Sequence, residues 1–259
     1  GPQVGRIESL ADVERLRIPE PAEALGFTLD AIRMLRKELG DVPLIGFGGG
    51  PFTLASYLVE GAISRGNARS YARTKQLCAR EPSMMHALLD KLSRTMAAYL
   101  AAQVEAGAQV IQVFDSWVGS LAPAYFDAFA LPYATRVVQA AQKAGAPVIY
   151  FGVETAGILE RMAQTGADVV GVDWRIDLDA ARARLGPSVA VQGNLDPAAL
   201  YLPEAELVRR VGDVLRRGGS TPGHVFNLGH GILPDTPVEA AQTVVGAVRS
   251  FRSPKSASA

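Results

Sequence analysis

The sequence predicts an α/β fold in which a parallel sheet is built from repeated strand–helix units. Three observations lead to this prediction. Short apolar runs recur along the chain, a polar or glycine-rich junction follows each run, and a longer amphipathic stretch fills the gap before the next run. Strands that alternate with helices pair in parallel, because a helical crossover brings the chain back to start the next strand at the same end of the sheet.

The expected strands are the apolar runs, which are four to six residues long and rich in Val and Ile. They are apolar at nearly every position, which is typical of strands that are covered on both faces. We therefore expect six strands, at residues 42–47, 110–114, 147–151, 169–172, 189–192 and 225–228.

Helices are expected in the gaps. A proline suited to the first turn opens the longest of them, at 82–105. Gly107, Gly145 and Gly166 follow three of the expected helices, where a left-handed residue commonly ends a helix before the next strand. The full set is 11–16, 28–39, 82–105, 131–144, 157–164, 178–185, 203–217 and 237–251.

Six strand–helix units fit two architectures. One is an open sheet wound on both sides, and the other is a (β/α)8 TIM barrel that lacks its first one or two β/α units, since a closed barrel has eight strands in about 250 residues. The helix expected at 28–39 has no strand before it, but periodicity and composition leave both architectures open. We expect a single domain at 1–252 and a flexible C-terminal tail at 253–259, where the residues are small and mostly polar.

The composition bounds the class of protein. The 259 residues carry 26 Lys+Arg and 26 Asp+Glu, and a net charge of zero gives no indication of a nucleic-acid or membrane partner. No apolar run approaches the roughly 20 residues that a membrane span needs. One cysteine, Cys78, and three histidines give neither an internal disulfide nor a zinc-ligand spacing, so we expect no metal and a cytoplasmic protein.

Ligands of parallel α/β folds bind at the carboxyl ends of the strands, so the junctions hold the candidate site residues. The glycine-rich junction at 46–53 lacks the Lys-Ser/Thr of a nucleotide-binding loop. Its glycines indicate a tight strand-to-helix turn or, less simply, a close approach of backbone to a ligand. Tyr57, in the segment that follows, reads from position alone as a core or rim aromatic. Ser116, at the next strand end, could cap a helix, and no G-x-S-x-G frame surrounds it.

The last junction is the most informative. His230 stands between Gly229 and Gly231 after the sixth expected strand, and the glycines give it little side-chain cover, which favours a functional role over a structural one. His86 in a long helix and His224 at the start of a strand are expected to be structural.

At these junctions the sequence resembles the uroporphyrinogen decarboxylase family. The matching segments keep the order of the family over nearly the whole chain, and several long segments in order are more specific than any single one. They are residues 45–61, 112–119, 171–174, 191–197 and the NLGHG of 227–231.

The resemblance implies a TIM barrel, a homodimer, and a carboxy-lyase of porphyrin and heme biosynthesis that uses no metal or organic cofactor. Such an enzyme removes the four acetate carboxyl groups of uroporphyrinogen III to give coproporphyrinogen III. A protonated pyrrole carbon would make the ring an electron sink, and an enzyme carboxylate would stabilise the cation. By the resemblance, Tyr57, Ser116 and His230 bind the substrate, the first two through hydrogen bonds to its polar groups and His230 at a carboxylate.

The sequence also departs from the family. It contains neither the Arg-containing segment nor the Asp-containing segment that the family carries after its first two strands, so no residue is assigned as catalytic, and the chain by itself is expected to be inactive. Two alternatives stay open. One is a non-catalytic tetrapyrrole-binding paralogue. The other is a methyltransferase of the same superfamily with zinc and a corrinoid partner, against which the lack of a His-x-Cys pair argues.

Overall fold

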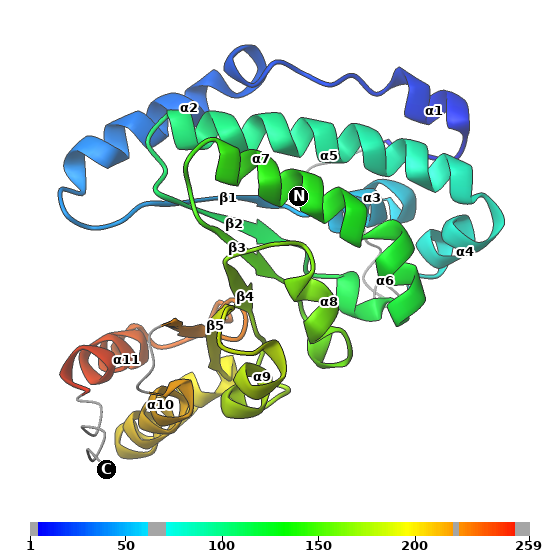
Figure 1. Cartoon of the computed structure of the whole chain (residues 1–259). Coiled ribbons are helices and arrows are strands. Elements are labelled where there is room, and N and C mark those ends of the chain that lie inside the picture. The colour runs from blue at the N-terminus through cyan, green and yellow to red at the C-terminus, as the bar shows by residue number, and fades with distance from the viewer. Residues whose placement is uncertain (1–4, 62–70, 220–222, 252–259) are drawn as a thin grey trace.

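A six-stranded parallel sheet forms the centre of the molecule (Figure 1). The computed structural model describes residues 5–61, 71–219 and 223–251. The strands of this part of the chain are β1 (Ile45–Gly49), β2 (Val110–Phe114), β3 (Val148–Phe151), β4 (Val169–Gly171), β5 (Ala190–Leu195) and β6 (His224–Leu228). Each strand pairs in parallel with the next one along the chain. All six predicted strands are therefore present.

The strand order decides between the two architectures. An open sheet wound on both sides reverses its order at a switch point, whereas this sheet runs from β1 to β6 without a reversal. Because crossovers between parallel strands are right-handed, a constant order places every crossover helix on the same face. In Figure 1 the sheet curves accordingly, with helices along its outer side. The described strands thus form consecutive units of the TIM-barrel type, six rather than the eight of a closed barrel.

The helices agree with the prediction in most places. The bounds are α1 (Leu10–Arg15), α2 (Pro21–Glu38), α3 (Pro51–Glu60), α4 (Ala72–Arg80), α5 (Pro82–Glu105), α6 (Pro123–Phe129), α7 (Leu131–Lys143), α8 (Leu159–Ala163), α9 (Leu178–Leu185), α10 (Glu204–Gly218) and α11 (Val238–Ser250), with 3-10 turns η1 (Val118–Ser120), η2 (Thr155–Gly157) and η3 (Pro197–Tyr201). Three of these, α3, α4 and α6, were not among the predicted helices. A proline at the first turn of α3 and of α6 was the signal for two of them.

The first strand lies later in the chain than predicted, at Ile45–Gly49 instead of 42–47. Val42 belongs to the turn after α2, where its N–H donates to the carbonyl of Leu39. The strand includes glycines because α5 packs directly on it. A Cβ on Gly46 would lie 2.6 Å from Oε1 of Gln103, and one on Gly48 would lie 2.4 Å from Cε of Met96. These glycines serve packing within the chain, which neither interpretation of the junction anticipated.

The two faces of the sheet differ in cover. The outer face meets the helices, and its residues, such as Val113, Val148 and Tyr150, are completely buried. On the concave face, Phe47 is 63% exposed and Val225 is 44% exposed. The expectation that every strand is covered on both faces is therefore wrong for β1 and β6, whose exposure alternates along the strand. These two strands lie at the ends of the sheet and have one neighbour each among the described residues.

Two further expectations concerned membrane-spanning segments and the C-terminal tail. Within the described ranges, none of the helices has the length and apolar character needed to cross a membrane. The tail expected at 253–259 lies outside the described residues.

Candidate functional site

A cavity of about 470 Å³ lies where the strands end. Its lining comes from the loops that follow β2, β3, β4, β5 and β6, together with the residue that precedes α4. We call it the mouth cavity, because this is the end of the sheet at which TIM-barrel enzymes bind their substrates. It is lined by Tyr71, Ser116, Trp117, Ser120, Val153, Glu154, Trp174, Arg175, Asp196, Pro197, Ala198, His230, Gly231 and Leu233.

Two of the three predicted site residues line this cavity. Ser116 follows β2 and His230 follows β6, so residues far apart in the sequence meet at one hollow. Tyr57 does not line it. Its ring contacts the indole of Trp117, with centroids 4.0 Å apart, and Trp117 does line the cavity. The three predicted residues thus lie at one end of the sheet, and the ring of Trp117 separates Tyr57 from the cavity.

Asp115 holds the loop that carries Ser116. Its carboxylate is completely buried and accepts hydrogen bonds from the backbone N–H of Thr53, at 2.8 Å, and from the hydroxyl of Tyr150, at 3.0 Å. The Thr53 hydroxyl in turn accepts the N–H of Trp117, at 3.1 Å. Burial raises the pKa of Asp115 above its ordinary value. The end of β2 and the start of α3 are therefore fastened to each other, which fixes Ser116, Trp117 and Tyr57 as a group.

The glycine before α3 is part of the same fastening. A Cβ on Gly50 would lie 2.2 Å from Cγ of Asp115, so only glycine allows the carboxylate to reach the start of the helix. The sequence showed no partner for Asp115, because Thr53 and Tyr150 belong to other strand–helix units.

A second buried carboxylate organises the loops after β3 and β4. Asp173 accepts the backbone N–H of Glu154, at 2.8 Å, and a guanidinium N–H of Arg175, at 2.6 Å. The guanidinium lies over the indole of Trp174, 4.2 Å from the ring centroid, and its other terminal nitrogen lies 3.3 Å from the Glu154 carboxylate. Trp174, Arg175 and Glu154 all line the mouth cavity but were not predicted as site residues.

His230 is placed by the same tryptophan. The two rings meet edge to face, with centroids 6.3 Å apart, and the imidazole is exposed to the cavity. The preceding glycine is required by packing, because a Cβ on Gly229 would lie 2.7 Å from the backbone nitrogen of Trp174. Gly231 has open space around its α-carbon, so only the first of the two glycines is explained by close packing.

The other two histidines make structural contacts, as predicted. His86 forms a hydrogen bond of 2.8 Å with the hydroxyl of Tyr133 and stacks on Phe129. His224 is bonded to the carbonyl of Gly193, at 2.8 Å, and burial lowers its pKa.

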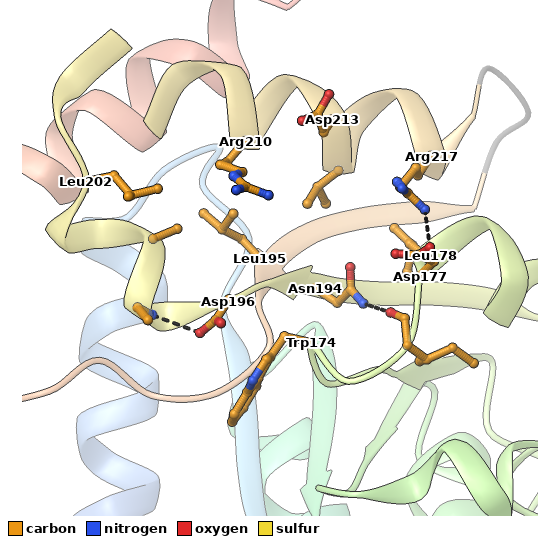
Figure 2. A pocket seen from close by; sticks show the side chains of 14 residues that line it. Trp174, Asp177, Leu178, Asn194, Leu195, Asp196, Leu202, Arg210, Asp213 and Arg217 are labelled. Carbon is orange, nitrogen blue, oxygen red and sulfur yellow. Dashed lines mark hydrogen bonds and ion pairs between the residues drawn. The ribbon is translucent and has the colours of Figure 1, made fainter. Parts of the chain in front are cut away.

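A second hollow, of about 390 Å³, lies beside the mouth cavity between β5, η3, α9 and α10 (Figure 2). Trp174, Asp196 and Ala198 line both hollows. Most of its charged side chains are already in ion pairs: Arg217 pairs with Asp177, as Figure 2 shows, and Arg210 pairs with Glu206 on the same helix. The second hollow contains none of the predicted site residues, so the mouth cavity is the stronger candidate.

The described part of the chain contains no group of three or more His, Cys, Asp and Glu side chains arranged to hold a metal ion. The mouth cavity instead offers hydroxyl, imidazole and guanidinium donors from Ser116, His230 and Arg175, with carboxylates at Glu154 and Asp196. Such a set can bind an organic molecule that carries several carboxylates.

Comparisons with known proteins identify the family of the chain. The family model described as "Uroporphyrinogen decarboxylase (URO-D)" matches residues 1–251. The chain is 51% identical over 243 residues to the uroporphyrinogen decarboxylase of Myxococcus xanthus, covering 93% of this chain and 68% of that protein. It is 47% identical over 255 residues to the uroporphyrinogen decarboxylase of Chloroflexus aurantiacus, covering 97% of this chain and 71% of that protein.

Solved structures show the same fold. A methyltransferase from Methanosarcina mazei superposes with a TM-score of 0.78 at 24% identity, covering 94% of this chain and 69% of that one. At this identity the likeness concerns the fold alone, and the family is shown by the sequence matches. The chain belongs to the uroporphyrinogen decarboxylase family.

Proposed function

We propose that this protein is a uroporphyrinogen decarboxylase, a carboxy-lyase that removes the acetate carboxyl groups of uroporphyrinogen III to give coproporphyrinogen III. The observation that carries the proposal is that Ser116 and His230, which the family resemblance marks as substrate-binding, line one cavity at the carboxyl ends of the strands. The family membership of residues 1–251 supports it.

The geometry assigns roles within this reaction. The Ser116 hydroxyl has no hydrogen-bond partner among the described residues and is available to a polar group of the substrate. The imidazole of His230 faces the same hollow and meets a carboxylate. Tyr57 acts through its contact with Trp117, because it supports the indole against which the macrocycle packs. Breaking the bond between the methylene carbon and the carboxylate releases CO2, and the protonated pyrrole ring accepts the electron pair of that bond. A proton added to the methylene carbon then completes the methyl group, and loss of the ring proton restores the pyrrole.

The proposal also covers the location, oligomeric state and cofactor requirement of the enzyme. By family resemblance it acts in the cytoplasm as a homodimer, takes part in heme biosynthesis and needs no metal or organic cofactor. Sedimentation of the purified chain tests the dimer, and a sedimenting species with the mass of one chain contradicts it.

Binding of uroporphyrin, the air-stable oxidised form of the substrate, tests the function. Both tryptophans of the chain, Trp117 and Trp174, line the mouth cavity, so quenching of their fluorescence reports occupancy. The test reads affinity rather than turnover, because Ser116 and His230 are proposed as substrate-binding residues.

Loss of a hydrogen bond should weaken binding about threefold to tenfold in Ser116→Ala, and loss of a bond to a charged group about tenfold or more in His230→Gln. Ser250→Ala, on the exposed face of α11, serves as the control and should bind as the wild type does. Absence of quenching in the wild type, or equal affinity in all three variants, contradicts the proposed function.

A further inference from the structure

Arg175 is a charged residue of the mouth cavity that the family resemblance does not assign. It follows β4 directly after Trp174 and lines the same hollow as Ser116 and His230. Its side chain is 37% exposed, so the guanidinium is accessible from the cavity while its position is restrained by neighbours.

Two contacts hold the guanidinium in place. One terminal N–H donates to Asp173, whose side chain is only 1% exposed, at 2.6 Å. The plane of the group lies over the indole of Trp174, 4.2 Å from its centroid. A guanidinium that is held on one edge and one face loses little further conformational entropy when its other edge binds a ligand. The Arg175 side chain is therefore preorganised to bind a carboxylate.

The remaining edge has a weak partner. The second terminal nitrogen lies 3.3 Å from the carboxylate of Glu154, whose side chain is 58% exposed. An exposed pair at this distance contributes little stability, since water competes for both groups. Glu154 also adopts a left-handed backbone conformation, with φ of 62°, while its N–H donates to Asp173. Such strain in a residue other than glycine is a common feature of functional sites.

We propose that Arg175 binds a carboxylate of the substrate, and that Glu154 is the counter-ion it releases when the substrate enters. The inference rests on the proposed function and deepens it, because it names a contact for the polycarboxylated macrocycle. Arg175 and His230 both contact the indole of Trp174, the guanidinium over its face and the imidazole with its ring nearly perpendicular to the indole. The two therefore present donors to neighbouring carboxylates of one ligand.

Uroporphyrin binding to the full chain, followed by tryptophan fluorescence over a range of salt concentrations, tests the inference. The variants are Arg175→Gln, Arg175→Lys, Glu154→Gln and the double variant. A matched control is the pair Arg184 and Glu160, which joins α9 to α8 at 2.7 Å with side chains 36% and 49% exposed, away from the mouth cavity. Arg184→Gln and Glu160→Gln remove an ion pair of similar exposure.

Arg175→Gln should weaken uroporphyrin binding about tenfold to a hundredfold, the range for hydrogen bonds to charged groups, and reduce its salt dependence. Arg175→Lys should fall between, because an ammonium lacks the planar double donor. Glu154→Gln should tighten binding about twofold to fivefold, as expected for removing an exposed ion pair. The double variant should lose that gain, and both control variants should bind as the wild type does.

The outcomes separate the inference from the proposed function. If both Arg175 variants bind uroporphyrin with wild-type affinity while Ser116→Ala and His230→Gln weaken it, the proposed function stands and the inference is overturned. If the wild-type chain does not bind, both are overturned. If Arg175→Gln does not fold, Arg175→Lys and Glu154→Gln decide, since a purely structural arginine predicts wild-type affinity and salt dependence in both.

Discussion

Replacement of Asp115 by alanine tests the fastening that places Ser116 and Tyr57. The substitution leaves two buried donors without an acceptor, the N–H of Thr53 and the hydroxyl of Tyr150. An unsatisfied buried donor costs about 1–3 kcal/mol. Because burial itself disfavours the charged carboxylate, part of this loss is offset, and we expect Asp115→Ala to lower the free energy of unfolding by about 2–4 kcal/mol.

Asp115→Asn is the matched control. The amide has the same shape and its oxygen accepts from Thr53, so only one of the two buried donors, the hydroxyl of Tyr150, loses its acceptor, and the loss should be about half of that in Asp115→Ala. Urea unfolding followed by tryptophan fluorescence measures both variants. An Asp115→Ala chain as stable as Asp115→Asn would refute the fastening.

The pH dependence of stability, compared between the wild type and Asp115→Asn, gives a second test. Burial raises the pKa of Asp115 in the folded protein above 3.8, its ordinary value, so the folded state holds the proton more tightly than the unfolded state does. The contribution of Asp115 to stability is therefore fully present below pH 3.8 and is lost as the pH rises through the raised pKa. The stability of Asp115→Asn relative to the wild type should increase over that interval. A constant difference contradicts the raised pKa.

Three further predictions concern packing and titration. Gly119→Ala places a Cβ 2.0 Å from the backbone carbonyl oxygen of Val153 and should lower the unfolding free energy by about 1–3 kcal/mol. Gly246→Ala, which has open space in α11, should raise it by about 0.5–1 kcal/mol, and equal urea midpoints for the two variants contradict this. Cys78 is 3% exposed, and burial raises its pKa to about 11, so iodoacetamide at neutral pH should label it only after unfolding; rapid labelling of the native protein argues against it. Burial lowers the pKa of His224 below 6.5, so its contribution to stability is present above pH 6.5 and is lost on acidification; His224→Gln should flatten the pH profile, and an unchanged profile overturns the assignment.

Much of the fold was predictable because local signals agree with the global arrangement. The apolar runs gave all six strands, and Gly107, Gly145 and Gly166 have φ of 116°, 106° and 80°, as expected of the residues that end three helices. The position of β1 was mispredicted because its glycines do not read as a strand. They are explained by α5, which packs on them from a distant part of the sequence.

The lining of the mouth cavity was predictable where residues directly follow strands. Ser116 and His230 were placed at this edge of the sheet in this way, since the carboxyl ends of parallel strands converge. Tyr57 lies on α3, so its direction depends on how that helix is rotated, which the sequence does not specify. Arg175 and Glu154 follow β4 and β3, and their position at the junctions was the available signal. Their pairing could not be predicted, because each reads alone as a solvated surface charge.

Around the mouth cavity, buried polar side chains repeatedly bond the backbone of a neighbouring strand–helix unit. These bonds fix the loops that carry the cavity-lining side chains. Asp115, after β2, accepts the N–H of Thr53 from the preceding strand–helix unit, and Asp173, after β4, accepts the N–H of Glu154 from the unit before it. Asn194 likewise donates to carbonyls in the loop after β4.

In each case a buried polar side chain at one strand end fixes the backbone that follows the neighbouring strand. Ser116 comes directly after the first buried carboxylate and Arg175 two residues after the second. The buried members therefore hold the loops in place, so that the Ser116 hydroxyl and the outer edge of the Arg175 guanidinium face the cavity. Such preorganisation lowers the entropy lost on binding. If this division holds, substituting the buried members should change stability and affinity together, whereas substituting Ser116 should change affinity with little effect on stability.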